Sequence, residues 1–208
     1  MIDIEVFERH LRTKWVGRDR LLLEQTDSTN NYAKTPPRDL VHGSLILANY
    51  QLKGRGQSGK SWFGDAHKNL YFSIFIKPLR TDGLFLLSLI SAHSIIESIR
   101  SYHLAHPLMN QLKIKWPNDV YIGEHKIAGI LTENIFHGGF LKGSVIGTGW
   151  NIDQDHFPPN LKYKASSLRL LFPETWIREE LLARYLNFFE HYYSCLLYTS
   201  PSPRDVEE

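Results

Sequence analysis

Short apolar runs separated by turn residues constrain the fold of this chain more than any other feature. Four such runs follow one another closely, at residues 112–116, 120–122, 126–133 and 140–148. The segments between them are rich in Pro, Asn, Asp and Gly, the residues that form tight turns. The pattern therefore predicts hairpin-like strands in this half of the chain rather than strand–helix–strand units.

The first half of the chain adds strands and a longer helix. Apolar runs of strand length occupy residues 21–25, 44–51 and 70–76, and residues 2–13 have a short amphipathic pattern. Strand runs interrupted by few helices indicate an α+β domain with a mixed, mainly antiparallel sheet flanked by helices.

A helix is predicted at residues 84–100 from apolar spacings of four and three. Its apolar positions share one face: Phe85, Leu89, Ala92, Ile96 and Ile99. Ser88, Ser91 and Ser94 lie mostly off that face, and so does Glu97. We therefore expect a single buried side, with the serines turned away from it.

Length and composition favour one globular unit. A chain of 208 residues can bury one substantial core, and we expect a catalytic domain over residues 1–170 followed by a helix and tail at 171–208. Within that segment a helix is predicted at 174–193, and residues 199–205 have the composition of a linker. A net charge of +2 does not by itself indicate a nucleic-acid partner.

Cysteine usage and the lack of long apolar runs indicate the compartment. Cys195 is the only cysteine, which excludes an intrachain disulfide and a cysteine-rich zinc site. No run approaches the roughly 18 apolar residues that a membrane span needs, and the start has no signal-peptide pattern. The expected location is therefore the cytoplasm, with no membrane partner.

A basic, glycine-rich loop at residues 54–62 joins two of the predicted strands. Its glycines let a ligand approach the backbone, and Arg55 and Lys60 supply positive charge for carboxylate or phosphate oxygens. Residues 54–61 also fit the P-loop pattern, but a P-loop opens a helix and residues 61–65 do not continue as one. Taken alone, the loop could also be a solvated basic hairpin loop, which is the less favoured alternative.

Two motifs place polar side chains beside a turn or beside bare backbone. Asn118 and Asp119 could bind a ribose or a magnesium-bound phosphate, although a simple Asn-Asp hairpin turn is the alternative. Lys126 begins an apolar strand three residues before Gly129. It could reach an anion lying against the backbone there, or it could lie in solvent like most strand-end lysines.

The segment from Gly147 through Gly149 to Asn151 is a fourth motif, which an ordinary bulge and turn could also explain. The order of the motifs resembles the biotin–protein ligase family over about residues 20–155. That family carries a Ser-Thr-Asn turn, a Gly-Arg-Gly loop ending in Trp, a Lys-Trp-Pro-Asn-Asp element, a Lys-(Ile/Leu)-Ala-Gly-Ile-Leu strand and a Gly-x-Gly-x-Asn strand end. Here they stand at residues 28–30, 54–62, 115–119, 126–131 and 147–151.

The resemblance implies the fold of biotin and lipoate ligase catalytic domains, which is similar to that of class II synthetases. It also implies an ATP-dependent ligase that forms a carbon–nitrogen bond. Such an enzyme activates biotin as biotinyl-5′-AMP, releases pyrophosphate, and transfers biotin to one lysine of a biotin carboxyl carrier protein. Biotin and ATP are then substrates, and Mg²⁺ accompanies the nucleotide.

The resemblance further implies roles for individual residues. Biotin would be bound by Ser28, Thr29, Gln51, Gly54, Arg55 and Gly129. ATP would be bound by Lys60, Trp62, Asn118, Asp119, Lys126 and Asn151. Trp62 would stack on adenine, and Asp119 would lie near Mg²⁺ through the phosphates. Lys126 and Arg55 would be catalytic, because positive charge stabilises the negative charge that builds on the α-phosphate.

Two features depart from the family pattern. Gln57 stands where many members have Arg, in the loop that holds the adenylate. The chain also stops soon after its last predicted helix, where members usually carry a small β-barrel domain. The stretch before Ser28 is too short for a helix-turn-helix domain, so DNA binding is not expected. The oligomeric state stays open, a homodimer included.

Two alternatives remain at this point. A lipoate or octanoyl ligase or transferase would share the fold, although octanoyl transfer through a thioester needs a placed cysteine, and Cys195 is far along the chain from every motif. A non-catalytic nucleic-acid or ligand-binding module could use the basic loop with Trp62 and Phe63. That reading leaves the other motifs unexplained.

Overall fold

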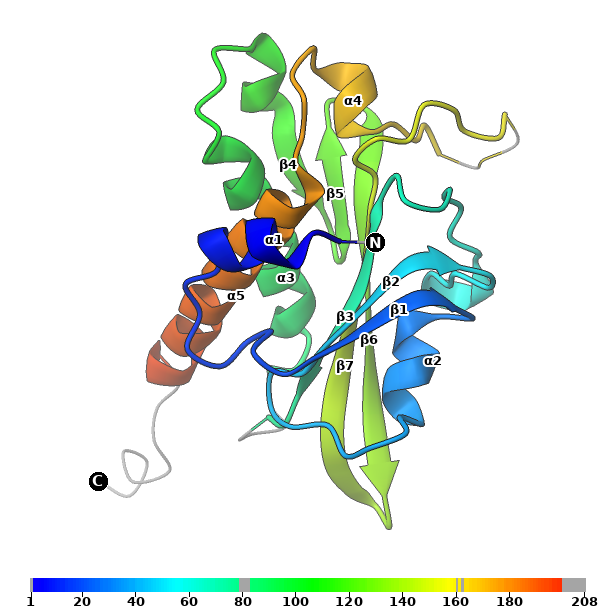
Figure 1. Cartoon of the computed structure of the whole chain (residues 1–208), viewed down its shortest axis with the longest axis vertical. Coiled ribbons are helices and arrows are strands. Elements are labelled where there is room, and N and C mark those ends of the chain that lie inside the picture. Colours follow the sequence, from blue (N-terminus) through cyan, green and yellow to red (C-terminus); the bar gives the residue numbers. More distant parts are fainter. Residues whose placement is uncertain (1, 79–82, 160, 162, 200–208) are drawn as a thin grey trace.

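One mixed sheet organises the molecule, with helices on both of its faces (Figure 1). The computed structural model describes residues 2–78, 83–159, 161 and 163–199. Within these residues the strand order is β1-β2-β3-β7-β6-β5-β4. The strands are β1 (Arg20–Thr26), β2 (Leu45–Gln51), β3 (Leu70–Ile76), β4 (Leu112–Lys115), β5 (Asp119–Ile122), β6 (His125–His137) and β7 (Phe140–Trp150).

Strand pairing is antiparallel everywhere except at one edge. β1 and β2 are parallel, and they are connected through the six-residue helix α2 (Thr29–Lys34). The other neighbours pair antiparallel, with β6 and β7 forming a long hairpin. The predicted α+β class, with a mixed and mainly antiparallel sheet, is confirmed.

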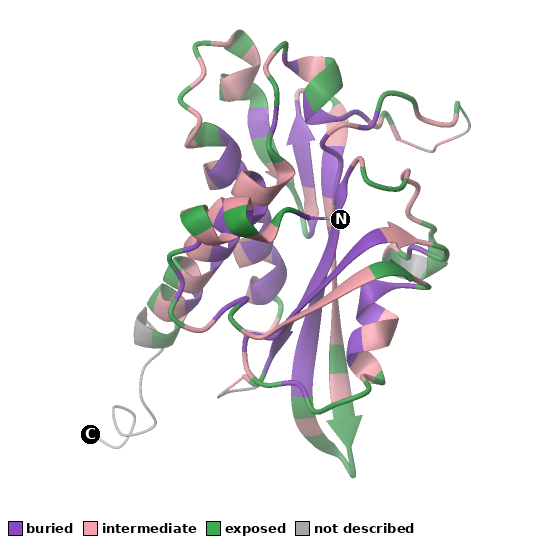
Figure 2. Cartoon of the chain, viewed as in Figure 1, coloured by how far each residue is buried: buried purple, intermediate pink, exposed green. Residues whose placement is uncertain are grey.

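The helices divide the core into a large and a small part. On one face, α1 (Ile4–His10), α3 (Leu86–Arg100) and α5 (Arg178–Thr199) cover the sheet and form the main core with it. On the other face, α2 covers a smaller apolar cluster that contains Ile46, Phe75 and Val145. All seven residues of β3 are buried because both faces of this strand are covered (Figure 2).

The last helices complete the same core. α4 (Leu168–Leu171) follows a loop that crosses the end of the sheet, and α5 packs along α3. The division of the chain at residue 170 stays a prediction, since α5 shares the main core through residues such as Leu182 and Tyr185. Of the predicted linker at 199–205, residues 200–205 lie outside the described residues. None of the helices that the structure describes is long and apolar enough to cross a membrane.

The predicted single buried face of α3 is wrong. Phe85 precedes the helix and is 64% exposed. Ser88, Ser91 and Ser94 are buried instead, because the sheet covers one side of α3 and α5 covers the other. The Ser91 hydroxyl lies 2.8 Å from the hydroxyl of Tyr185 on α5. Hydrogen bonding of this kind lets a row of serines be buried at a helix–helix contact.

Candidate active site

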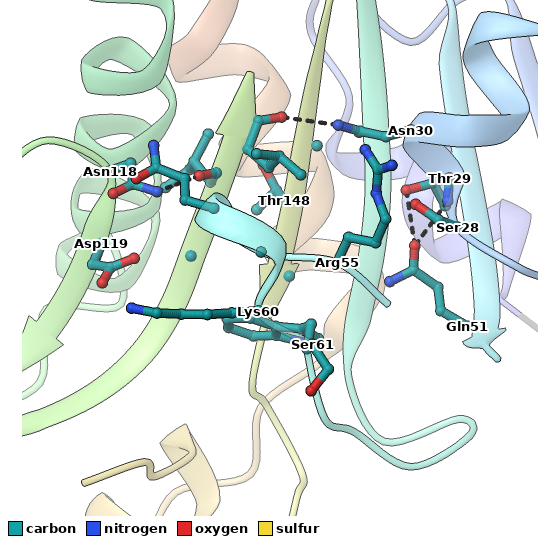
Figure 3. A pocket seen from close by; sticks show the side chains of 18 of the residues that line it. Ser28, Thr29, Asn30, Gln51, Arg55, Lys60, Ser61, Asn118, Asp119 and Thr148 are labelled. Carbon is teal, nitrogen blue, oxygen red and sulfur yellow. Dashed lines mark hydrogen bonds between the residues drawn. The ribbon is translucent and has the colours of Figure 1, made fainter. Parts of the chain in front are cut away.

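A pocket opens beside α2, under the loop that links β2 to β3 (Figure 3). Its concave space measures about 720 Å³ when its open mouth is included. Residues from α2, β2, the loop, β5, β6 and β7 surround it. Ten residues predicted for the site line it: Ser28, Thr29, Gln51, Arg55, Lys60, Trp62, Asn118, Asp119, Lys126 and Gly129.

One end of the pocket is uncharged and polar. The Thr29 backbone N–H donates to Oε1 of Gln51 over 2.8 Å, which joins the start of α2 to the end of β2. Ser28 is the N-cap residue of α2, but its hydroxyl makes no capping hydrogen bond. Ser28 and Thr29 are buried, and their side chains lie together with Gln51 at this end (Figure 3). The groups present donors and acceptors suited to a compact polar ligand group.

The other end is basic and is dominated by Lys126. Its ammonium lies 2.7 Å from Oδ1 of Asp119 and is stacked between two rings, 5.4 Å from the centre of Trp62 and 4.8 Å from that of Tyr163. Burial lowers the pKa of Lys126 below its ordinary value, against the opposing effect of the Asp119 carboxylate. Lys60 also lines this end (Figure 3). The site therefore holds a desolvated positive charge beside the pocket.

Glycines of β6 and β7 let Trp62 lie directly on the sheet. A Cβ at Gly149 would be 2.5 Å from Cε2 of Trp62, and one at Gly129 would be 2.8 Å from Cζ3. A Cβ at Gly129 would also lie 3.1 Å from Nζ of Lys126. Any side chain at these two positions would displace the indole. The contact of Trp62 with adenine stays a prediction.

The basic loop is pinned at both ends and does not open a helix. A β-bridge pairs Arg55 with Ser61, and the Trp62 N–H donates to the Gly54 carbonyl over 2.8 Å. A single 3₁₀ turn, η1 (Gln57–Gly59), forms its tip, and the chain then runs on without helix. This geometry rules out the P-loop reading. Arg55 itself is paired with Glu133 on β6.

Two predicted ligand contacts do not line the pocket. Gly54 begins the loop and packs against its last residue, where a Cβ on Gly54 would be 2.8 Å from the Trp62 carbonyl oxygen. Asn151 is buried, and its Nδ2 donates to the carbonyl of Ser166 over 3.0 Å. It ties the segment that carries Tyr163 to the sheet. Neither geometry tests the family role of these residues, which stays a prediction.

Asn30 and Tyr163 are two of the lining residues to which the sequence reasoning gave no role. Asn30 belongs to the Ser-Thr-Asn turn but was given no role; its side chain lies over Gly147, where a Cβ would be 2.1 Å from Oδ1. Gly147 was the sequence feature that could have indicated this contact, since a glycine leaves space for a side chain to lie over the strand. Tyr163 comes from a polar segment without a motif, and nothing in the sequence marks it.

Comparison with known proteins agrees with the site. Residues 22–151, which include every motif quoted above, match the biotin/lipoate A/B protein ligase family. This chain belongs to that family. The match spans β1 to the end of β7 and therefore all the strands that border the pocket.

Individual relatives of the family give the same picture. The bifunctional ligase/repressor BirA of Escherichia coli is 33% identical over 140 residues, which are 65% of this chain and 41% of that protein. The biotin–[acetyl-CoA-carboxylase] ligase of Mycobacterium tuberculosis is 29% identical over 194 residues, 88% of this chain and 69% of that protein. The chain thus spans less than half the length of the E. coli relative.

A solved structure of a biotin protein ligase has the same fold as this chain. Biotin protein ligase from Aquifex aeolicus in complex with biotin and ATP superimposes with a TM-score of 0.75 at 27% identity, covering 88% of this chain and 73% of that one. The sheet with its flanking helices is therefore the shared catalytic-domain architecture.

Proposed function

We propose that this chain is a biotin–protein ligase: it activates biotin with ATP and transfers it to a lysine of a biotin carboxyl carrier protein. The observation that carries the proposal is the pocket itself, which joins an uncharged polar end at Thr29 and Gln51 to a basic end at Lys126. Biotin has the matching polarity, with a ureido ring at one end and a carboxylate at the other. Relatives named as biotin ligases support the assignment.

The polar end favours biotin over lipoate or octanoate. A ureido group offers N–H donors and a carbonyl acceptor, which can meet the buried Ser28 and Thr29 groups and the half-buried Gln51 amide. A dithiolane ring or an alkyl chain offers neither, so it would desolvate these polar groups without replacing the hydrogen bonds that they can make to a ligand. Unpaired buried polar groups reject a ligand strongly, so the lipoyl alternative is disfavoured.

The basic end suits adenylation. In this step a biotin carboxylate oxygen attacks the α-phosphorus of ATP, and the bond from that phosphorus to the oxygen bridging to the β-phosphate breaks, releasing pyrophosphate. Negative charge builds on the phosphate oxygens, and Lys126 would stabilise it there. Arg55 would hold the biotin carboxylate, and Lys60 would hold phosphate oxygens.

The transfer step needs no nucleophile from the enzyme. The acceptor lysine amine attacks the anhydride carbonyl, an amide bond forms, and AMP leaves. Cys195 lies on α5, on the face of the sheet opposite α2, which is consistent with a reaction that forms no enzyme thioester. The single cysteine also supports a reducing compartment such as the cytoplasm.

Asp119 is the residue suited to Mg²⁺. It is the one carboxylate among the described residues that line the pocket, and it faces the basic end. Mg²⁺ usually takes one or two protein carboxylates and completes its shell with phosphate oxygens and water. The donor set therefore fits a magnesium ion that arrives with ATP and supplies charge neutralisation there.

The test is direct. The chain is incubated with biotin, MgATP and a biotin carboxyl carrier domain, and the carrier mass is followed by mass spectrometry, with lipoate and octanoate replacing biotin in parallel samples. We expect the mass of one biotinyl group on one lysine, dependent on ATP. Modification by lipoate or octanoate in preference to biotin would reject the proposal.

A further inference from the structure

A continuous chain of side-chain hydrogen bonds leads from the polar end of the pocket to β6. Gln51 Oε1 accepts from the backbone N–H of Thr29 over 2.8 Å. Ser73 Oγ on β3 lies 2.7 Å from the Thr29 hydroxyl and 2.7 Å from Oδ1 of Asn30. Asn30 Nδ2 donates to Oε2 of Glu133 over 2.9 Å. Thr29, Asn30 and Ser73 are all buried, so their hydrogen bonds are shielded from water (Figure 3 shows Thr29, Asn30 and Gln51).

The orientation of the Asn30 amide is determined by its neighbours on β6. Its Nδ2 lies 3.0 Å from the carbonyl oxygen of Leu131 as well as 2.9 Å from Glu133. A carbonyl and an ionised carboxylate can only accept, so both must face the NH₂ group. Asn30 Oδ1 is therefore turned toward Ser73 and can only accept from it.

Counting hydrogens then fixes the state of the Thr29 hydroxyl. Ser73 has one hydroxyl hydrogen, and Asn30 Oδ1 requires it. The contact between Ser73 and Thr29 must consequently use the Thr29 hydrogen. Gln51 Oε1 lies 3.2 Å from the same hydroxyl but already has the shorter bond from the Thr29 backbone. Thr29 Oγ1 thus presents lone pairs to the pocket and is poised to accept from a ligand N–H.

The second oxygen of Glu133 is bonded to two basic side chains. Oε1 accepts from Nζ of Lys34 over 2.6 Å and from Nη2 of Arg55. Burial raises the pKa of Glu133, but the hydrogen bonds from Lys34, Asn30 and Arg55 outweigh this effect and hold the pKa below its usual value. A guanidinium has five N–H donors, so a bond through Nη2 leaves others to meet a ligand anion.

We propose that Glu133 is a positioning residue for biotin that acts along two paths, one through Asn30 and Ser73 and one through Arg55, without touching the ligand. Its charge directs the hydrogen bonds through Asn30 and Ser73, so that Thr29 accepts from a ureido N–H. The same carboxylate holds Arg55 in place for the biotin carboxylate. Glu133 does not line the pocket, in keeping with an indirect role. The inference rests on the proposed function and deepens it.

The experiment measures biotin affinity by calorimetry for Glu133→Gln, Ser73→Ala and the double variant. Glu133→Gln keeps the size of the side chain and removes its charge, and we expect biotin to bind about tenfold more weakly, since charged hydrogen bonds are at stake. Ser73→Ala breaks only the path to Thr29, and we expect biotin to bind about fivefold more weakly to this variant. In the double variant the combined loss should be well below the product of the two, because both changes disable one path.

Matched controls come from α3. Glu97 is a partly buried glutamate paired with Arg100, and Ser98 is a buried serine bonded to a carbonyl of its own helix. Glu97→Gln and Ser98→Ala should leave biotin affinity within about twofold of the parent. A positioning role also predicts that Glu133→Gln raises the KM for biotin while the KM for ATP stays near parental. Equal losses for both substrates would indicate general damage and overturn the proposal.

The other outcomes are equally clear. Biotin affinity within about twofold of the parent for Glu133→Gln would reject the role of Glu133. Losses that multiply fully in the double variant would reject the path from Glu133 through Asn30 and Ser73 to Thr29. If Glu133→Gln does not fold, Ser73→Ala decides alone, and parental affinity in that variant would reject the path to Thr29. A parental chain that binds no biotin would reject the proposed function itself.

Discussion

Replacing Lys126 by Ala should separate the chemistry of the site from ligand binding. The Lys126 side chain is only 12% exposed, and its ammonium lies near the rings of both Trp62 and Tyr163, so water screens it poorly. One preorganised charge or donor in such a place contributes about 10² to 10³ in rate, or roughly 3 to 4 kcal/mol. We expect biotinyl-adenylate formation to fall by that factor. Biotin affinity should change within about threefold, because Thr29 and Gln51 are untouched.

The loss must be distinguished from damage to the fold. Lys126→Ala leaves Asp119 without its partner, and the two side chains are only 12% and 22% exposed. The cost in unfolding free energy should therefore lie between the about 1 kcal/mol of an exposed pair and the roughly 3 to 5 kcal/mol of a fully buried one. Lys126→Met keeps most of the side-chain bulk and should lose the same rate. Lys126→Arg should recover only part of it, since a planar guanidinium does not occupy the place of a compact ammonium.

Two assays report on the two half-reactions. Pyrophosphate release follows adenylation, and single-turnover transfer from supplied biotinyl-adenylate follows the second step. Lys68, which pairs with Asp155 outside the pocket, provides a matched control through Lys68→Ala. Near-parental rates for Lys126→Ala in both assays would refute the reasoning, and a loss in the first assay alone would limit Lys126 to the α-phosphate.

Three further outcomes are expected. Arg55→Ala should weaken biotin binding about tenfold, since its side chain is 40% exposed and only partly desolvated; calorimetry checks this, and a change below about threefold would reject a biotin-binding role for Arg55. The two glycines of β7 should separate the ends of the pocket: Gly147→Ala, which crowds Asn30, should raise the KM for biotin, and Gly149→Ala, which crowds Trp62, should raise the KM for ATP, each about tenfold or more, in steady-state assays. Because burial lowers the pKa of Lys126, the adenylation rate should fall on the alkaline side at a pH below the ordinary lysine value of 10.5, as the ammonium loses its proton; Lys126→Arg should lack this fall in a pH–rate profile.

The strands could be predicted because local patterns determine them, whereas their partners could not. Apolar runs bounded by turns identified each strand to within a few residues, and short turns identified the β6–β7 hairpin. The parallel pairing of β1 with β2 depends on contacts across residues 20–51, which no local pattern records. The covered serine side of α3 was missed for a related reason. Periodicity reports the most apolar face of a helix, and the contact with α5 comes from a segment some 90 positions away, as the Ser91–Tyr185 bond shows.

The same distinction holds at the site. Residues in ordered motifs, such as Lys126 and Asn118, were found, since each motif carries its own turn or glycine. The role proposed for Glu133 depends on its hydrogen bond with Asn30, which is 103 positions away in the sequence, so it could be inferred only from the folded chain. The sequence motif also did not predict the structural role of Asn118. Its buried Nδ2 donates to the Ile130 carbonyl over 2.6 Å and so fastens the turn to β6.

The glycines of β7 explain why two distant motifs serve one pocket. Gly147 and Gly149 are two positions apart on a strand and so face the same side of the sheet, about 7 Å from each other. Asn30 of α2 fills the space over the first, and Trp62 of the loop fills the space over the second. Residues of the polar end and of the basic end of the pocket therefore both pack on the same strand, β7. We expect a displacement of Trp62 to leave the hydrogen bonds of Asn30 unchanged, since their partners lie on β3 and β6 and not on the loop.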